Sequence, residues 1–300
     1  MLLADAIEDY YYYCLSKEFT AKTMKNKQQE YKQFSQFVKD KRGIKNIEDI
    51  TKHDLQAYIR YKQQDRQLQA QSIVSTAKQV KAFLNWCVQE EYISSNPFYG
   101  VVLPKLPKRL SQGLTQSEVK SLLKATNGNS YMETRNKAII AIMADCGLRS
   151  HEVRQLKNNS IKDNAILVSG KGNKDRMVFI SPELKRILLK YERFKRKYFK
   201  SKQTQEYYFL SYQGQMMSHT ALHILVKHVA SKAGVNDVHP HKLRHYYAVQ
   251  AISGDNPIDI YSLSRLLGHS DISTTQRYLE SLSNDELLKK ALSVSPLSNF

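Results

Sequence analysis

Cysteine is scarce in this chain of 300 residues. The three cysteines are Cys14, Cys87 and Cys146, an odd number, and no two of them form a CxxC pair. This spacing argues against a disulfide framework and against a cysteine-rich zinc site. We expect three reduced thiols.

Long apolar runs are also missing. No stretch reaches the roughly 18 apolar residues that a membrane helix needs, and the first ten residues carry acids where a signal peptide has a basic start. We therefore expect a cytoplasmic protein without a membrane segment.

Acidic residues are outnumbered. The chain has 28 Asp and Glu against 46 Lys and Arg, a formal net charge of +18 and a pI near 9.6. An excess of this sign suits a partner with dense negative charge, and nucleic acid is the leading candidate. A merely basic soluble protein would have the same charge, so the motifs must decide.

Apolar positions recur at steps of three and four residues through the first 90 residues, with little proline or glycine between them. This periodicity predicts helices over residues 2–16, 20–40, 52–64 and 71–90. Three prolines and three cations follow within residues 96–110 and indicate a linker. We place the domain boundaries at 1–102 for a helical first domain, 103–112 for the linker and 113–300 for the second domain.

The second domain begins with helical patterns and then changes period. Thr115 and Glu118 form a capping box, and an apolar segment covers residues 136–146. Residues 165–169 and 177–180 are rich in β-formers and predict a hairpin. The fold class is therefore mainly α with a small β-sheet, the second domain being mixed α+β.

Ser181 and Pro182 start a further helix with an unusual charge. A solvated basic face and a phosphate-binding face explain it equally well. Its cations are Lys185, Arg186, Lys190, Arg193, Lys195, Arg196, Lys197 and Lys200.

Four short segments of the second domain concentrate residues suited to phosphate chemistry. Each alone is common in basic helical proteins, but their order and spacing are not. The segments are CGLRSHE at residues 146–152, GKGNKDR at 170–176, HKLRH at 241–245 and LGHSDISTTQRY at 267–278.

Together these segments resemble the tyrosine recombinase family, the phage integrases and Xer-type recombinases, and the helical first domain extends the resemblance over essentially the whole chain. The resemblance implies a SAM-like core-binding domain before the catalytic domain, with Glu152 as the acid after the first arginine. Ser150 and His151 stand in the reverse of the order found in many relatives. The implied catalytic residues are Arg149, Lys171, His241, Arg244, His269 and Tyr278.

The chemistry follows from the residue types. Cleavage of a phosphodiester needs a nucleophile, cations for the non-bridging oxygens and an acid for the departing 5′-oxygen. Arg149 and Arg244 suit the clamp because a guanidinium fork donates two parallel hydrogen bonds to phosphate. Lys171, with Lys174 as the alternative, suits the acid. Tyr278 would form a 3′-phosphotyrosyl bond that needs neither ATP nor a metal.

His241 lies three residues before Arg244, so the two share one face of a helix. This histidine is expected to assist proton transfer from the tyrosine, with His269 and the arginines contributing to its activation. His239, His241 and His245 also have a spacing that suits a metal, but no acid lies among them.

The resemblance further implies integration, excision or resolution of a mobile element or replicon dimer. The implied partners are double-stranded DNA at specific recombination sites, a homotetramer on paired sites and accessory proteins; no cofactor is expected. A helix within residues 283–300 would pass to the neighbouring subunit.

Three other functions compete with this one. Residues 261–269 and 272–278 also fit a helix-turn-helix, which would make the protein a non-enzymatic DNA-binding regulator. A metal-dependent nuclease would need paired carboxylates, which the sequence does not show. A relaxing topoisomerase would share the tyrosine chemistry but would reseal one site instead of exchanging strands between two.

Overall fold

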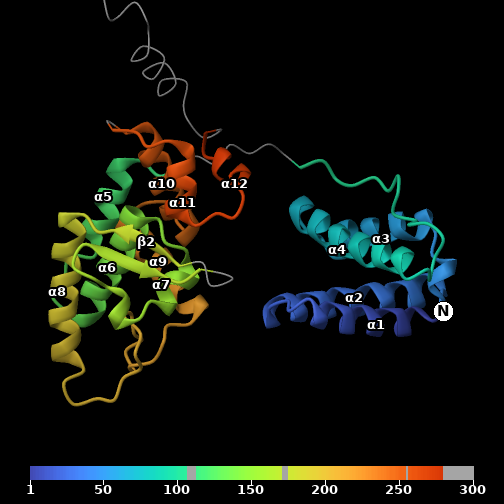
Figure 1. Ribbon diagram of the computed structural model, residues 1–300, viewed down its shortest axis with the longest axis horizontal. Helices are drawn as coiled ribbons and strands as arrows, with labels where there is room; N and C mark the ends of the chain where they lie inside the picture. Colours follow the sequence, from blue (N-terminus) through green and yellow to red (C-terminus); the bar gives the residue numbers. More distant parts are fainter. Residues whose placement is uncertain (107–112, 171–174, 255, 280–300) are drawn as a thin grey trace, which may run out of the picture. The chain divides into compact units, whose positions relative to one another are not determined.

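The computed structural model describes residues 1–106, 113–170, 175–254 and 256–279. The chain divides into two compact units, Met1–Arg109 and Leu110–Phe300. Helices dominate both units, and the second contains a two-stranded sheet (Figure 1). The predicted fold class is confirmed. Across the described residues, every helix is too short or too polar to cross a bilayer.

The first unit contains four long helices, whose ends lie within two residues of the predicted ends. Gly43, at φ 68°, ends the second of them in the left-handed conformation that glycine tolerates. The carboxylate of Asp54 accepts the backbone N–H of Thr51 at 3.0 Å and caps the third. The elements are α1 (Leu3–Ser16), α2 (Ala21–Arg42), η1 (Ile47–Asp49), α3 (Lys52–Gln64) and α4 (Ala70–Gln89).

A charged pair is buried inside this helical unit. Glu30 of α2 accepts a hydrogen bond from Tyr58 Oη at 2.6 Å and from Lys62 Nζ at 3.0 Å, both on α3. Thr76 of α4 donates to the same carboxylate at 3.3 Å. Lys62 is 1% exposed, so the carboxylate and the ammonium depend on each other for charge compensation. The pair joins three helices.

The second unit, in its described residues, contains eight helices around one hairpin. The elements are α5 (Gln116–Ala125), α6 (Tyr131–Cys146), α7 (Ser150–Gln155), η2 (Asn158–Ser160), β1 (Ala165–Val168), β2 (Arg176–Phe179), α8 (Pro182–Tyr198), α9 (His219–Ala233), α10 (Pro240–Ser253), α11 (Ile260–Leu267) and α12 (Ser273–Gln276).

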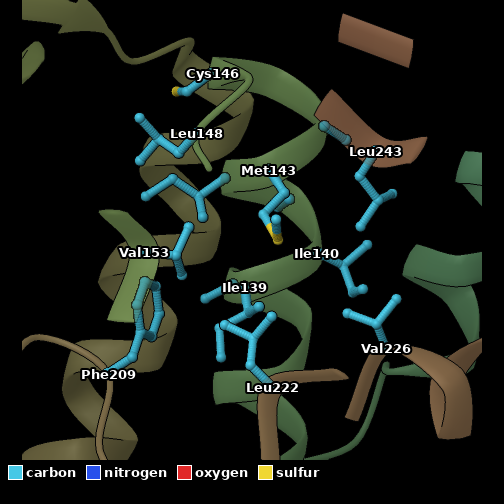
Figure 2. Packing of buried hydrophobic residues seen from close by; sticks show 14 of the residues in the cluster. Ile139, Ile140, Met143, Cys146, Leu148, Val153, Phe209, Leu222, Val226 and Leu243 are labelled. Atoms are coloured by element: carbon cyan, nitrogen blue, oxygen red, sulfur yellow. The ribbon is translucent and has the colours of Figure 1, made fainter. Parts of the chain in front are cut away.

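Helix α6 lies at the centre of this unit. Ile139, Ile140 and Met143 are fully buried, and α8, α9 and α10 pack around the helix. Figure 2 shows Val226 of α9 and Leu243 of α10 against the same helix. From Ala138 to Ala144 every residue of α6 is apolar and buried, as is typical of a core helix. Its packing fixes the position of its C-terminal end, where the first predicted catalytic segment begins.

The predicted hairpin is present. Strands β1 and β2 are antiparallel, with Ala165 opposite Phe179 and Val168 opposite Arg176. The connection includes residues 171–174, so the predicted general acid Lys171 lies outside the described residues. The second strand starts at Arg176, one residue before the predicted start, and this residue belongs to the site described below.

The buried pair in the first unit gives a test of its packing. We expect Lys62→Ala to lower the free energy of unfolding by about 3–5 kcal/mol, because it leaves the Glu30 carboxylate buried without a cation. The control is Lys78→Ala, which removes an exposed cation from α4. Urea unfolding of both full-length variants, followed by circular dichroism, measures the difference. Equal stabilities would show that the buried pair contributes nothing.

Candidate active site

Arg149 stands at the turn between α6 and α7. Gly147 ends α6 in the left-handed conformation, with φ 62°, and a Cβ atom there would come within 2.4 Å of the ring of Tyr247. The backbone N–H of Arg149 donates to the Glu152 carboxylate at 2.7 Å and so begins α7. The backbone at Arg149 is therefore fixed by the Gly147 turn before it and by the hydrogen bond to Glu152 after it.

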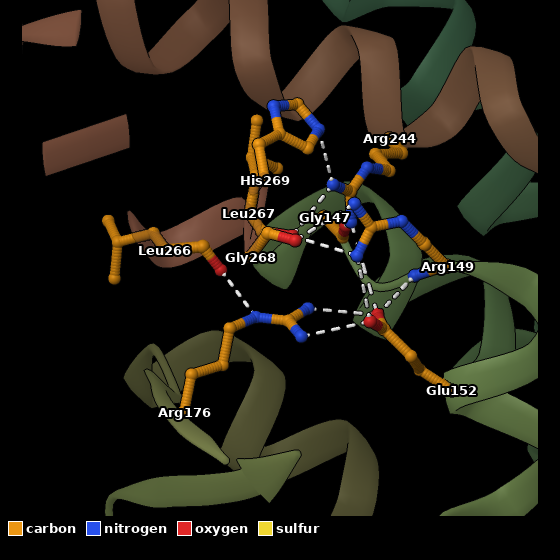
Figure 3. A network of polar contacts seen from close by, with 9 residues as sticks. All are labelled: Gly147, Arg149, Glu152, Arg176, Arg244, Leu266, Leu267, Gly268 and His269. Carbon is orange, nitrogen blue, oxygen red and sulfur yellow. Dashed lines mark hydrogen bonds and ion pairs between the residues drawn. The ribbon is translucent and has the colours of Figure 1, made fainter. Parts of the chain in front are cut away.

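The Glu152 carboxylate is the centre of the polar contacts (Figure 3). Its side chain is 1% exposed and accepts hydrogen bonds from Arg149 Nη1 at 3.1 Å and from Arg176 Nη1 and Nη2 at 2.9 and 2.8 Å. Arg244 Nη1 lies 3.9 Å away. Burial raises the pKa of this carboxyl, but the hydrogen bonds and charge of Arg176 and Arg149 outweigh burial and lower the pKa to about 2. The carboxylate thus stays ionised and gathers three guanidinium groups.

Arg176 is a member of this cluster to which the sequence analysis assigned no role. It holds Glu152 with two parallel hydrogen bonds, and its Nε–H donates to the Leu266 carbonyl at 2.8 Å. The guanidinium therefore ties β2 to α7 and to the end of α11. Its position at the end of the GKGNKDR segment was the available signal, but the sequence does not show which way the side chain points.

Arg244 of α10 is 1% exposed. It donates to the Gly147 carbonyl at 2.7 Å and to the Leu267 carbonyl at 2.8 Å, and Arg149 donates to the same Leu267 oxygen at 3.1 Å. Burial, followed by the charge of Arg149, lowers the pKa of Arg244 to about 10, against the opposing effect of Tyr278 and Glu152. The group remains charged at neutral pH. The structure brings the two predicted clamp residues together.

His269 follows α11 and connects Arg244 to the next turn. Its Nε2 lies 2.9 Å from Arg244 Nη2, and its Nδ1 lies 2.7 Å from Thr275 Oγ1. Because a guanidinium can only donate, Nε2 accepts and the proton of the neutral ring lies on Nδ1. Burial, then the charges of Arg244, Arg149 and Arg176, lowers the pKa of this histidine to about 4. Thr275 is fully buried, and nothing in the sequence spacing singled it out.

Tyr278 is 5% exposed and packs against α10 and α11. Its ring centroid lies 6.2 Å from that of His269, with the planes 16° apart, and 5.3 Å from that of His245. A hydrogen bond with Tyr278 acts to raise the pKa of Arg244. The tyrosine thus joins the same cluster as Arg244 and His269.

The segment before Tyr278 contains a short helix. Helix α12 spans Ser273–Gln276, whereas the helix-turn-helix alternative required a helix over residues 272–278. The backbone N–H of Tyr278 bonds to the Thr275 carbonyl at 3.0 Å, an i to i+3 bond that tightens the chain. The four-residue helix is too short to serve as a recognition helix, and it turns the tyrosine inward.

His241 lies at the start of α10 and its side chain is exposed. Partial desolvation, followed by the charges of Arg244, His239 and Arg149, lowers its pKa, so the neutral imidazole is favoured. The described residues hold no group of three or more His, Cys, Asp or Glu that could bind a metal.

Two family models match the chain. The model of the phage integrase family matches residues 112–285, and the model of the phage integrase SAM-like domain matches residues 3–103. The chain belongs to the phage integrase family. The suspected resemblance is confirmed, and with it the prediction of an enzyme, a tyrosine site-specific recombinase.

Curated relatives are similar over most of their length. The tyrosine recombinase XerD of Proteus mirabilis is 31% identical over 233 residues, which cover 76% of this chain and 74% of the relative. The tyrosine recombinase XerC of Bacillus pumilus is 28% identical over 291 residues, covering 95% and 94% of the two chains.

Solved structures confirm the fold. The Tn1549 transposon integrase in complex with circular intermediate DNA matches with a TM-score of 0.74 at 18% identity, covering 97% of this chain and 99% of that chain. A lambda integrase dimer bound to a core site matches with a TM-score of 0.73 at 17% identity, covering 95% and 97%.

The partly buried, neutral state of His269 predicts a pH dependence of stability. An unfolded imidazole, with a pKa near 6.5, takes up a proton as the pH falls from 6.5 towards 4, while the folded ring remains neutral. Stability should therefore be full above pH 6.5 and decrease towards pH 4. We expect His269→Gln to reduce this slope by at most about 1.4 kcal/mol per pH unit.

Urea unfolding at pH 4.5, 5.5, 6.5 and 7.5 measures the slope, and His228→Gln, at an exposed position of α9, is the control. If His269→Gln had the same slope as the control, the ring would not be held neutral by its surroundings.

Proposed function

We propose that this recombinase cleaves one DNA strand with the phenolic oxygen of Tyr278, forms a 3′-phosphotyrosyl bond and rejoins the strand to a new partner. The observation that carries the proposal is the position of Tyr278 beside Arg244, in one cluster with Arg149 and His269. Names of relatives support DNA as the substrate, since the matching Tn1549 and lambda integrase structures contain it.

Arg149 is the accessible donor to the phosphate. Its side chain is 32% exposed, whereas that of Arg244 is 2% exposed. In the described part of the chain it directs three N–H bonds to Glu152, Leu267 and Gly268. A guanidinium has five N–H donors, so Nε–H and one Nη2–H remain for the non-bridging oxygens. Arg244 contributes charge from a buried position, where electrostatic stabilisation is strongest.

The nucleophile needs a group that accepts its proton. Nε2 of His269 is already the acceptor for Arg244, so this histidine positions the arginine. His241 is the better proton acceptor, because its lowered pKa keeps it neutral at pH 7. The nearby guanidinium groups would stabilise the phenolate that forms.

The leaving group needs an acid, and Lys171 is the candidate. Its hairpin starts from strands whose position is fixed near the site, because Arg176 at the start of β2 is bound to Glu152. A lysine close to that anchor would donate its proton to the 5′-oxygen.

In this scheme one P–O bond forms for each P–O bond that breaks, so ATP is not needed. The tyrosine oxygen attacks phosphorus, the bond to the 5′-oxygen breaks, and that oxygen leaves as a hydroxyl. A 5′-hydroxyl from a second strand then attacks the phosphotyrosine and releases Tyr278. The reaction serves integration, excision or resolution of a mobile element or replicon dimer.

The assembly proposed with this chemistry is a homotetramer on paired sites, with or without accessory proteins. A core-binding domain at residues 1–102 and a catalytic domain at residues 113–300 would hold the DNA, joined by residues 103–112. The exchanged helix within residues 283–300 lies outside the described residues.

Replacing the nucleophile tests the proposal directly. Tyr278→Phe should abolish covalent attachment to DNA and leave DNA binding nearly unchanged, because the phenyl ring preserves the packing on α10 and α11. The control is Tyr261→Phe, at a residue that is 63% exposed on α11.

The assay uses a nicked duplex that carries a binding sequence selected from a randomised pool, and it scores complexes that resist denaturing detergent. An adduct in Tyr278→Phe would exclude this tyrosine as the nucleophile.

A further inference from the structure

A row of cations covers the outer face of α8. The row consists of Arg186, Lys190, Arg193 and Lys197, and Lys200 follows just past the helix end. We call these five residues the α8 stripe. With 3.6 residues per turn, the four helical members lie within an arc of about 60°, and the arc is centred opposite the buried side of the helix. That buried side consists of Leu184, Leu188 and Tyr191.

The stripe has no internal counter-charge. Within the described residues, none of its five cations lies within 4 Å of a carboxylate, whereas Lys185 on the flank of the same helix does pair with Asp163. The unpaired members Arg186, Arg193 and Lys197 are exposed. Glu183 and Glu192 lie on the same helix, but within the described residues neither of them is ion-paired with a member of the stripe.

A second observation places more positive charge beside it. Lys137 of α6 joins Arg186 and Lys190 around a pocket of about 200 Å³. The pKa of Lys137 is lowered by partial burial and by the charge of Lys190. Two ammonium groups therefore repel each other at this end of the stripe, and an anion between them would relieve that repulsion.

The Lys190 part of the stripe lies far from the candidate active site. Lys190 donates to the side chain of Asn129 at 2.9 Å, just before α6 begins, whereas Arg149 follows the end of α6. The helix between them has 16 residues, which correspond to about 24 Å. In Figure 1, α8 lies at the edge of the second unit, across α6 from α11 and α12.

We infer that the α8 stripe binds the phosphate backbone of a second DNA duplex, in addition to the duplex held at the active site. The rise from Arg186 to Lys197 is about 17 Å at 1.5 Å per residue, which matches about five base pairs of 3.4 Å. Arginine and lysine side chains that are not paired with a carboxylate give a sequence-independent contact of this kind. The inference goes beyond the proposed function, since strand cleavage does not require the stripe.

The test uses the full chain saturated with an unlabelled duplex that carries its selected site. A labelled 16-base-pair duplex of unrelated sequence is then titrated at several salt concentrations. The stripe variant is Arg186→Gln, Arg193→Gln and Lys197→Gln, and the matched control is Lys120→Gln, Lys124→Gln and Lys157→Gln, which removes the same charge from other exposed positions. Circular dichroism confirms that both variants are folded.

We expect the wild type and the control to bind the second duplex and the stripe variant to bind it at least about tenfold more weakly. The slope of log affinity against log salt should become shallower by about 2.7, because each lost contact removes about 0.9 of a released counterion. The stripe variant should cut the site duplex at the wild-type rate. The Tyr278→Phe variant should lose cutting but bind the second duplex as the wild type does. The proposal that Tyr278 is the nucleophile and the inference about the α8 stripe can therefore fail independently.

Several results would overturn the inference. One is a saturated wild-type complex that binds no second duplex. Another is equal affinity of the stripe variant and the control variant for the second duplex, which would show that net charge, and not the stripe, determines this binding. Binding of poly-glutamate in preference to DNA would show that the partner is an acidic protein.

Discussion

The buried carboxylate of Glu152 is the interaction on which the candidate site depends. It lies at the start of α7 and pairs with arginines from the α6–α7 turn and from β2, while Arg244 of α10 lies 3.9 Å away. Three guanidinium groups would otherwise repel one another in a poorly hydrated space. One carboxylate that remains ionised stabilises all three, and it takes up only part of their hydrogen-bonding capacity.

The Leu267 carbonyl completes this arrangement. Arg149 and Arg244 both donate to it, so the end of α11 is held against the arginine cluster. The chain continues through His269, which accepts from Arg244 and contacts Thr275, and then reaches Tyr278. The position of the tyrosine is thus coupled to the position of the arginines through a short run of hydrogen bonds. A shift of α11 or α12 would move both.

Periodic apolar spacing and capping residues made the helices predictable, and the hairpin followed from β-formers on either side of a glycine-rich turn. Arg149, Arg244, His269 and Tyr278 were found through the spacing of their motifs and the resemblance to a family. Arg176 and Thr275 were missed because their contacts join segments far apart in the chain, and sequence spacing carries no such information. The neutral state of His269 was equally hidden, since it depends on desolvation and on the charges of three arginines that meet only in the folded protein. The short α12 differs from the helix over residues 272–278 that the helix-turn-helix alternative required.

The central claim is that Glu152 holds the arginines in their catalytic positions. The single-turnover cleavage rate of Glu152→Gln, measured on a pre-bound nicked duplex, tests it most directly, because glutamine keeps the shape but turns an amide N–H₂ towards guanidinium donors. We predict a folded protein that binds DNA and cleaves it slower by a factor on the order of 100 or more, as expected when charge donors lose their preorganisation. Cleavage at the wild-type rate by a folded Glu152→Gln protein would contradict the claim.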